Sequence, residues 1–106
     1  KVYGLVNNAG INPSRNNITN TSLEDWHSTL NVNLTGAFNC SKSVINCMYE
    51  NKCGSIVNIS SIAGITALSN RTSYMASKSG LIGFSKWLST LWAKNNIKVK
   101  SMIKSR

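Results

Sequence analysis

The stretch GSIVNISS, residues 54–61, lies between two helical patterns and has the residues of a β-strand. Gly54 ends the first pattern, and SIVNISS then supplies β-favouring side chains over the usual length of a strand. Upstream, apolar residues recur between positions 30 and 48 at steps of three, four and seven, which predicts one long helix or two helices in succession. Gly36, inside that pattern, marks either a close-packing point or a bend.

The first helical pattern follows a segment with the composition of a loop, INPSRNNITNTS. Thr21 or Ser22 can cap the first turn, and Glu24 and Asp25 follow in that turn, near the positive end of the helix dipole. We therefore expect helical structure over residues 23–50.

The segments before residue 11 and after residue 61 complete the series of expected elements. IAGITALSNRT has the composition of a loop, and residues 73–96 place apolar side chains at helical spacing before ending at Asn95 and Asn96. IKVKSMI, residues 97–103, alternates polar and apolar side chains as a strand does. At the start of the chain, VYGLVNNAG, residues 2–10, predicts a buried strand followed by a turn.

The resulting order, β-α-β-α-β, is typical of an α/β fold with a parallel sheet and right-handed crossovers. Two such crossovers in the same direction place both helices on one face of the sheet, whereas a parallel sheet is normally covered on both faces. The 106 residues therefore correspond to about half of a doubly wound domain.

The composition argues against several classes of protein. A hydrophobic content of 42% is sufficient for a packed core, so the chain is not expected to be disordered. No apolar run is long enough for a membrane-spanning helix, and no membrane partner is expected. The net charge of +9 comes from 12 Lys and Arg against three acids, but the cations are scattered rather than clustered, which argues against nucleic-acid binding.

The cysteines and the single histidine indicate neither a disulfide framework nor a metal site. Cys40, Cys47 and Cys53 are odd in number and lack Cys-x-x-Cys spacing, which fits reduced thiols. Cys40 and Cys47 share one helix face and are expected to be buried. His27 has no second ligand candidate at metal-binding spacing. Because the start of the chain has no features of a signal peptide, we expect a cytoplasmic location, or an organelle if a targeting segment lies upstream.

SYMASKSG, residues 73–80, places Tyr74 and Lys78 one turn apart on the same face of the second helix. A phenol is a poor base at neutral pH, and a nearby ammonium favours its ionised form. Such a tyrosine can donate a proton to a carbonyl oxygen or accept one from an alcohol. The pair alone is weak evidence, because Tyr and Lys at this spacing are common on solvated helix faces.

Other polar and small residues follow the predicted strands, at the edge where doubly wound sheets bind their ligands. Ser61 ends the central strand, although a serine there can also serve ordinary turn chemistry. Asn33 falls inside the first helix, where Asn is mildly unfavourable. Two non-functional explanations are a solvent-facing position and a local hydrogen bond to the backbone. NNAG, residues 7–10, ends the first strand with small residues that let a flat ligand approach the backbone.

Four segments, NNAG, NVNLTGAF, GSIVNISSIAG and YMASKSGLIGFSK, occur in an order and at spacings that resemble the short-chain dehydrogenase/reductase family. The resemblance is closest to the group that includes 3-oxoacyl-acyl-carrier-protein reductases and related sugar or polyol dehydrogenases. It extends from residue 2 to about residue 99. It implies a partial Rossmann-like, NAD(P)-binding fold and hydride transfer between a nicotinamide and a ketone or secondary alcohol.

The resemblance also implies roles for individual residues. Tyr74 would be the catalytic acid/base, and Lys78 would assist it and bind the nicotinamide ribose. Ser61, rather than Ser60, would hold the substrate oxygen, and Asn33 would anchor a water that links Lys78 to solvent. The other cofactor-binding positions would be Asn8, Ala9 and Gly10.

Two parts of the family pattern are not found in these 106 residues. The Gly-rich phosphate-binding turn and the residue that selects NAD or NADP would precede Lys1, and the substrate-binding portion would follow Arg106. The likeness to reductases slightly favours NADP. Lys100 stands where the family commonly has Asn, and Lys104-Ser105 stands in place of a Pro-Gly turn. We expect weak or no dinucleotide binding by the 106-residue chain itself.

Three interpretations of function remain open. The first is an oxidoreductase segment that acts on a small carbonyl compound or alcohol, or on an acyl-carrier substrate such as a 3-oxoacyl thioester in fatty acid synthesis. The second is a non-catalytic remnant or oligomerisation module, because the helices that correspond to residues 23–50 and 73–96 often form subunit interfaces in the family and would support a homo-oligomer. The third, binding of nucleic acid, is the least favoured.

Overall fold

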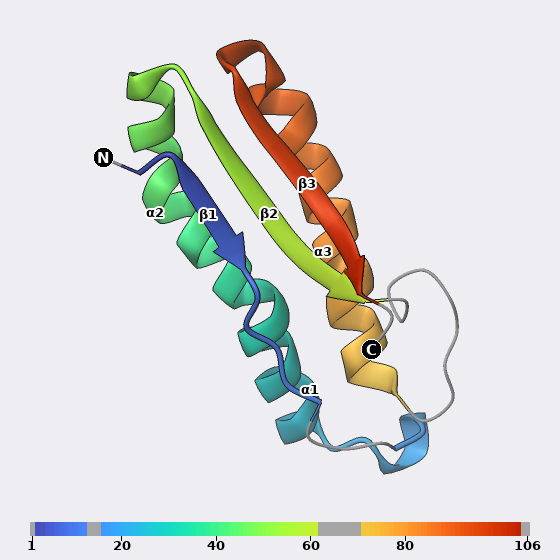
Figure 1. The fold of residues 1–106 in the computed structure, drawn as a ribbon. Coiled ribbons are helices and arrows are strands. Elements are labelled where there is room, and N and C mark those ends of the chain that lie inside the picture. The colour runs from blue at the N-terminus through green and yellow to red at the C-terminus, as the bar shows by residue number, and fades with distance from the viewer. Residues whose placement is uncertain (1, 13–15, 62–70, 105–106) are drawn as a thin grey trace.

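The computed structural model describes residues 2–12, 16–61 and 71–104 (Figure 1). Within these residues, β1 (Gly4–Asn7), β2 (Gly54–Ser61) and β3 (Ile97–Lys104) form one parallel sheet in the order β1-β2-β3. The helices are α1 (Leu23–Leu30), α2 (Gly36–Asn51) and α3 (Thr72–Trp92), with short 3-10 segments at Ile18–Asn20 and Ala93–Asn95 and a π-helical segment at Asn31–Thr35. The predicted order of elements and the parallel sheet are confirmed.

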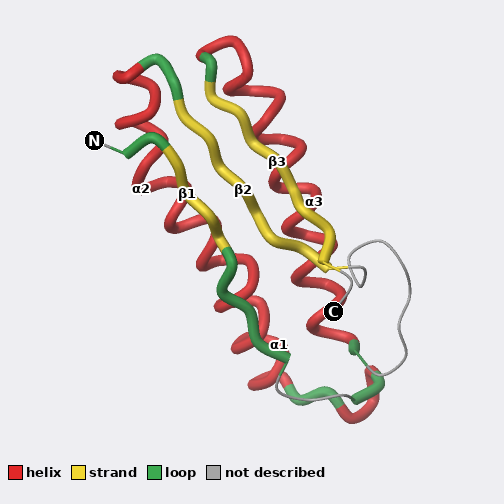
Figure 2. The backbone as a smooth tube through the Cα atoms, viewed as in Figure 1, coloured by secondary structure: helices red, strands yellow, loops and turns green. Residues whose placement is uncertain are grey.

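Helices α2 and α3 lie on the same face of the sheet, as expected from two crossovers in one direction (Figures 1 and 2). The two faces can be followed along β3, where Ile97 and Val99 are buried and Lys98 and Lys100 are exposed. Because alternate side chains of a strand point to opposite faces, β1 also exposes half of its residues. Val6 of β1 is 62% exposed, so the prediction of a buried first strand is wrong.

The hydrophobic core lies between the sheet and helices α2 and α3. Ile56, in the central strand, is fully buried and belongs to one cluster with Met48 from α2 and Leu88 from α3. The inward-facing residues of β3, Ile97 and Val99, complete this cluster. The apolar faces of β2, β3, α2 and α3 therefore meet in a single core.

The long helical pattern consists of two helices joined by the π-helical segment, which is one of the two expected arrangements. Ser22 caps α1, because its hydroxyl accepts a hydrogen bond of 3.0 Å from the Asp25 N–H. Gly36 begins α2, and a Cβ built on it would meet only the Asn31 carbonyl oxygen, at 3.6 Å, among the described atoms. Gly36 is therefore not a close-packing point.

Helix α2 turns a different face toward the sheet from the one the cysteines occupy. It buries Ala37, Ser41 and Met48, whereas Cys40 is exposed and Cys47 is partly buried. The prediction that both cysteines are buried is therefore wrong for Cys40. The three thiols are free. In the described part of the chain, no helix has the length and apolar character to cross a membrane, and no three metal-ligating side chains gather.

A chain of buried polar side chains links the sheet to α3. Asn7 of β1 donates to Asn58 of β2 at 2.7 Å, and Asn58 donates to the Ser85 hydroxyl of α3 at 2.8 Å. Ser85 in turn donates to the Leu81 carbonyl at 2.8 Å. Buried polar groups are tolerated when they are paired in this way. If β1, β2 or α3 shifted along its axis relative to the others, these side chains would lose their hydrogen-bond partners.

Candidate active site

A small polar cavity of about 200 Å³ lies at the carboxyl end of the sheet, beside the first turns of α3. Parallel strands of doubly wound folds bind their ligands at this edge. The cavity is lined by Asn8 and residues 10–12 after β1, by residues 59–61 at the end of β2, by Tyr74 and Lys78 of α3, and by Lys104 of β3. Most of the residues predicted from the sequence therefore meet in one place.

Tyr74 and Lys78 lie one turn apart on α3 and both line the cavity. The Lys78 Nζ lies 5.8 Å from the centroid of the Tyr74 ring. Lys78 is only 5% exposed, and its Nζ donates a hydrogen bond of 3.1 Å to the Ile59 carbonyl of β2. The ammonium is thus held between the central strand and the phenol ring.

Ser60 and Ser61 are both buried at the end of β2, and both line the cavity. The Ser60 hydroxyl donates a hydrogen bond of 3.1 Å to the Lys78 carbonyl, so it joins β2 to α3. This bond gives Ser60 a structural role at the base of the cavity. The assignment of Ser61 as the residue that holds the substrate oxygen stays a prediction.

Asn33 lies in the π-helical segment and is 1% exposed. Its Oδ1 accepts a hydrogen bond of 2.7 Å from the Ile11 N–H, and its Nδ2 donates to the Ile11 carbonyl at 2.9 Å and to the Ser77 hydroxyl at 3.1 Å. The two non-functional explanations for Asn33, a solvent-facing position and a local hydrogen bond to the backbone, are therefore wrong. The amide joins the turn after β1 to α3, and its role in anchoring a water stays a prediction.

Gly10 brings the turn after β1 close to Lys78. A Cβ built on Gly10 would lie 3.2 Å from the Lys78 Nζ and 3.5 Å from the Asn33 Oδ1, so a larger residue would displace the ammonium. Asn8 lines the same cavity. Ala9 does not, since it lines a separate pocket together with residues of β1 and α2. Of the three predicted cofactor contacts in this turn, the structure thus places two beside Tyr74.

Lys104 is a residue of the cavity that we did not predict as a site residue. It is the last residue of β3 and stands opposite Ser61 in the register with β2. Burial of the ammonium lowers the pKa of Lys78, and the positive charge of Lys104 lowers it further. The signal available in the sequence was the predicted end of the last strand at residue 103, because the residue that follows a parallel strand lies at the edge of the sheet where ligands bind.

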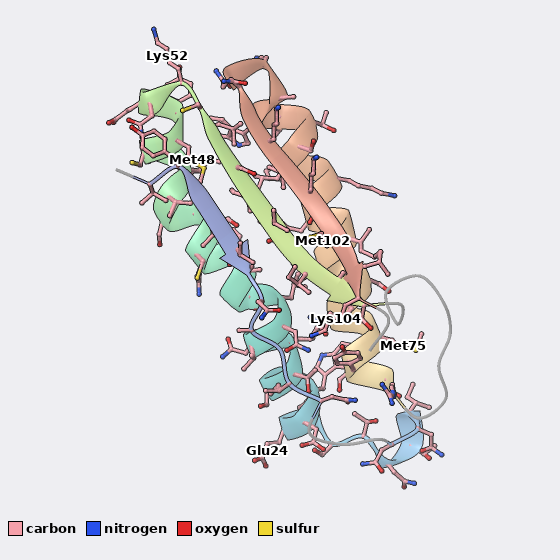
Figure 3. All side chains as sticks on the ribbon, in the orientation of Figure 1. Glu24, Met48, Lys52, Met75, Met102 and Lys104 are labelled. Atoms are coloured by element: carbon pink, nitrogen blue, oxygen red, sulfur yellow. The ribbon has the colours of Figure 1, made fainter. Side chains whose placement is uncertain are left out.

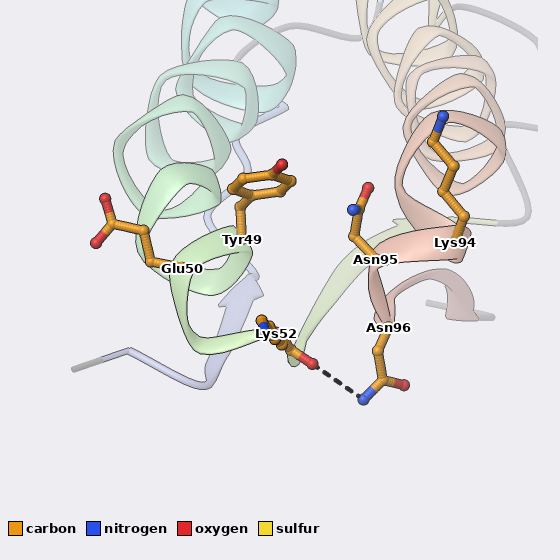
Figure 4. Close-up of a pocket in the computed structure, with 6 residues that line it drawn as sticks. All are labelled: Tyr49, Glu50, Lys52, Lys94, Asn95 and Asn96. Atoms are coloured by element: carbon orange, nitrogen blue, oxygen red, sulfur yellow. Dashed lines mark hydrogen bonds between the residues drawn. The ribbon is translucent and has the colours of Figure 1, made fainter.

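Another pocket, at the opposite end of the sheet, is a weaker candidate. It has a volume of about 390 Å³ and lies where α2 and α3 end (Figure 4). The Asn96 side chain donates a hydrogen bond of 3.3 Å to the Lys52 carbonyl across it. It is remote from the carboxyl ends of the strands and from Tyr74. Its lining consists of Tyr49, Glu50, Lys52, Lys94, Asn95 and Asn96.

The residues of the smaller cavity fit the nicotinamide end of a dinucleotide. The Lys78 ammonium and the Asn8 amide can bond ribose and carboxamide groups. The missing Cβ of Gly10 leaves room for the Lys78 ammonium beside the backbone of this turn.

Comparisons with known proteins agree with this geometry. The family model described as short chain dehydrogenase matches residues 1–104. A 3-oxoacyl-[acyl-carrier-protein] reductase of Thermotoga maritima is 42% identical over 98 residues, which are 92% of this chain and 39% of that protein. One of Synechocystis sp. is 39% identical over 99 residues, with the same two coverages of 92% and 39%.

Two solved structures are also similar to this chain over most of its length. ElxO with NADP bound superposes with a TM-score of 0.92 at 35% identity, over 95% of this chain and 41% of that one. A 4-hydroxyisoleucine dehydrogenase complexed with NADH gives a TM-score of 0.87 at 36% identity, over 92% of this chain and 43% of that one. The chain thus spans about two-fifths of the length of these relatives. The family match over nearly all its residues shows that this chain belongs to the short-chain dehydrogenase/reductase family.

Proposed function

We propose that this chain is the central catalytic portion of an NAD(P)-dependent oxidoreductase that interconverts a ketone and a secondary alcohol. The observation that carries the proposal is the position of Tyr74 beside the buried Lys78 ammonium, in a polar cavity at the carboxyl edge of the sheet. The names of the relatives, which are reductases and dehydrogenases, support the same class of reaction.

The proposed chemistry assigns each described residue a separate task. The nicotinamide cofactor, when bound, supplies or accepts the hydride at the carbonyl carbon. During reduction, Tyr74 donates its hydroxyl proton to the carbonyl oxygen, and during oxidation it accepts that proton from the alcohol. Ser61 donates a hydrogen bond to the same oxygen. The Lys78 ammonium stabilises the negative charge that forms on the phenol oxygen and bonds the ribose together with Asn8.

The finer features of the function are also proposals. The relatives named 3-oxoacyl-[acyl-carrier-protein] reductase favour a 3-oxoacyl thioester as substrate and NADP as cofactor. Three free thiols favour a reducing compartment such as the cytosol.

The outer surfaces of α2 and α3 support a homo-oligomer built through these helices. Phe38 of α2 and Trp87 and Leu91 of α3 are 47%, 59% and 46% exposed, although all three are large and apolar. Exposed apolar patches of this kind mark interaction sites, and the expected partner is a second copy of the chain.

Removal of this apolar surface should dissociate the oligomer. Because most of the driving force comes from buried apolar area, Trp87→Ser should shift the mass measured by light scattering toward the monomer. Lys86→Ser is the neighbouring control, since it removes a side chain that is exposed but not apolar. A parent protein that is monomeric at all concentrations would contradict the proposed assembly.

Removal of the phenol oxygen should abolish turnover. In the full-length protein, Tyr74→Phe should lower kcat by about 100-fold or more, because the phenol supplies the proton that the carbonyl oxygen takes up in the proposed reaction. Cofactor affinity, measured by fluorescence titration, should stay close to that of the parent. Tyr49→Phe, which removes the same atom from a half-exposed residue at the opposite end of the sheet, is the matched control. Turnover above about a tenth of the parent rate would contradict the assignment.

The lowered pKa of Lys78 predicts a pH dependence of stability. Between the lowered pKa in the folded state and the ordinary value of 10.5, the unfolded chain binds the proton of this lysine and the folded chain does not. The free energy of unfolding should therefore rise with pH through this window. Urea denaturation should show that Lys78→Met lacks part of this rise, whereas Lys98→Met, which removes an exposed lysine, retains it. Identical pH profiles for the parent and Lys78→Met would contradict the lowered pKa.

A further inference from the structure

Lys104 gives the cavity a second positive charge that the proposed reaction does not use. Its side chain lines the same space as Tyr74 and Lys78, and its backbone stands opposite Ser61. Figure 3 labels Lys104 at the end of β3, near the first turns of α3. The cavity therefore receives two lysines from two different elements, one from the helix and one from the strand.

No carboxylate lines this cavity in the described part of the chain. The whole sequence contains only three acidic residues, and none of them lines this cavity. Glu24 and Asp25 lie in the first turn of α1, and Glu50 lines the pocket at the opposite end of the sheet. Two like charges that share a partly buried space repel each other, and the lowered pKa of Lys78 agrees with that repulsion.

We propose that Lys78 and Lys104 together form a binding site for an oxyanion beside Tyr74, so that the ligand taken up there carries a carboxylate or phosphate group near the reacting carbon. An ammonium has three N–H donors, and one of those of Lys78 bonds the Ile59 carbonyl. Its remaining donors and those of Lys104 can therefore hold an oxyanion from two sides. Charge-assisted hydrogen bonds of this kind are stronger than neutral ones.

The position of Lys104 distinguishes it from the other lysines of the same strand. Lys98, Lys100 and Lys104 all belong to β3, and all three are exposed. Only Lys104 reaches the end of the strand and lines the cavity with Tyr74. Lys98 and Lys100 therefore serve as matched controls with the same charge on the same element.

The size of the cavity narrows the class of ligand. A volume of about 200 Å³ suits a small group such as a carboxylate or phosphate and its neighbouring carbons. A neutral ketone would leave both ammonium groups without a counter-ion. Two sources of the oxyanion are compatible with this chemistry. One is a carboxylate on the carbonyl substrate, which a 3-oxoacyl thioester lacks, and the other is a phosphate on the cofactor. The experiments below separate them. The part that concerns the reacting carbon rests on the proposed function.

The first experiment needs no turnover. The full-length protein is acetylated with trace acetic anhydride, and the label on each lysine is measured by mass spectrometry with inorganic phosphate, with NADP, with 3-oxobutanoate, or with neutral butanone. At least one of the three anions should lower the reactivity of Lys104 severalfold, while Lys98 and Lys100 change little. Protection by 3-oxobutanoate favours a substrate carboxylate, and protection by phosphate and NADP alone favours the cofactor. No protection of Lys104, or equal protection of all three lysines, would overturn the proposal.

The second experiment compares Lys104→Gln with Lys100→Gln. For a substrate carboxylate, Lys104→Gln should lower kcat/KM for 3-oxobutanoate by about tenfold and leave its methyl ester nearly unchanged, since one hydrogen bond to a charged group is lost. Lys104→Arg, which keeps the charge, should restore most of the loss. For a cofactor phosphate, Lys104→Gln should instead weaken NADP binding in a titration.

The outcomes separate this proposal from the proposed function. Equal losses for the acid and the ester without weaker NADP binding, or an equal loss in Lys100→Gln, would overturn the oxyanion site even if the enzyme is active. If the parent protein reduces neither compound with either cofactor, the proposed function fails for these substrates, and the lysine labelling still decides whether the oxyanion site exists.

Discussion

The side-chain amide of Asn33 joins the elements that carry the candidate site. It bonds both backbone groups of Ile11, in the turn after β1, and the hydroxyl of Ser77 on α3. Ser77 in turn donates a hydrogen bond of 2.7 Å to the carbonyl of Tyr74. Asn33 and Ser77 are buried and Ile11 is partly buried, so removal of the amide would leave the backbone groups of Ile11 without a side-chain partner. The positions of Gly10 beside Lys78 and of Tyr74 on α3 thus depend on one residue in a π-helical segment.

The remaining geometry follows from the way the sheet is covered. Helices α2 and α3 pack on one face, and the polar chain from Asn7 through Asn58 to Ser85 fixes the offset of β1, β2 and α3. The register between β2 and β3 makes these two strands end together, so that Ser61 and Lys104 stand opposite each other at the edge where α3 presents Tyr74. The core determines the register, and the register determines which side chains share the cavity.

The sequence was sufficient for the features that depend on local periodicity. The order of elements and the shared helix face of Tyr74 and Lys78 follow from spacings of two, three and four residues, and both are confirmed. The contacts of Asn33 could not be predicted, because its partners lie 22 and 44 residues away in the chain. The place of Lys104 depended on the register of two strands, and the exposure of Val6 depended on which face of the sheet is covered.

Amide hydrogen exchange at Ile11 tests the central role of Asn33 most directly. In Asn33→Ala, the Ile11 N–H loses its acceptor, so its protection should fall strongly while that of Ile56, in the central strand, changes little. Asn31→Ala, which alters an exposed residue of the same π-helical segment, should leave Ile11 protected. Unchanged protection of Ile11 in Asn33→Ala would contradict the account, because the turn after β1 would then be held by something other than this amide.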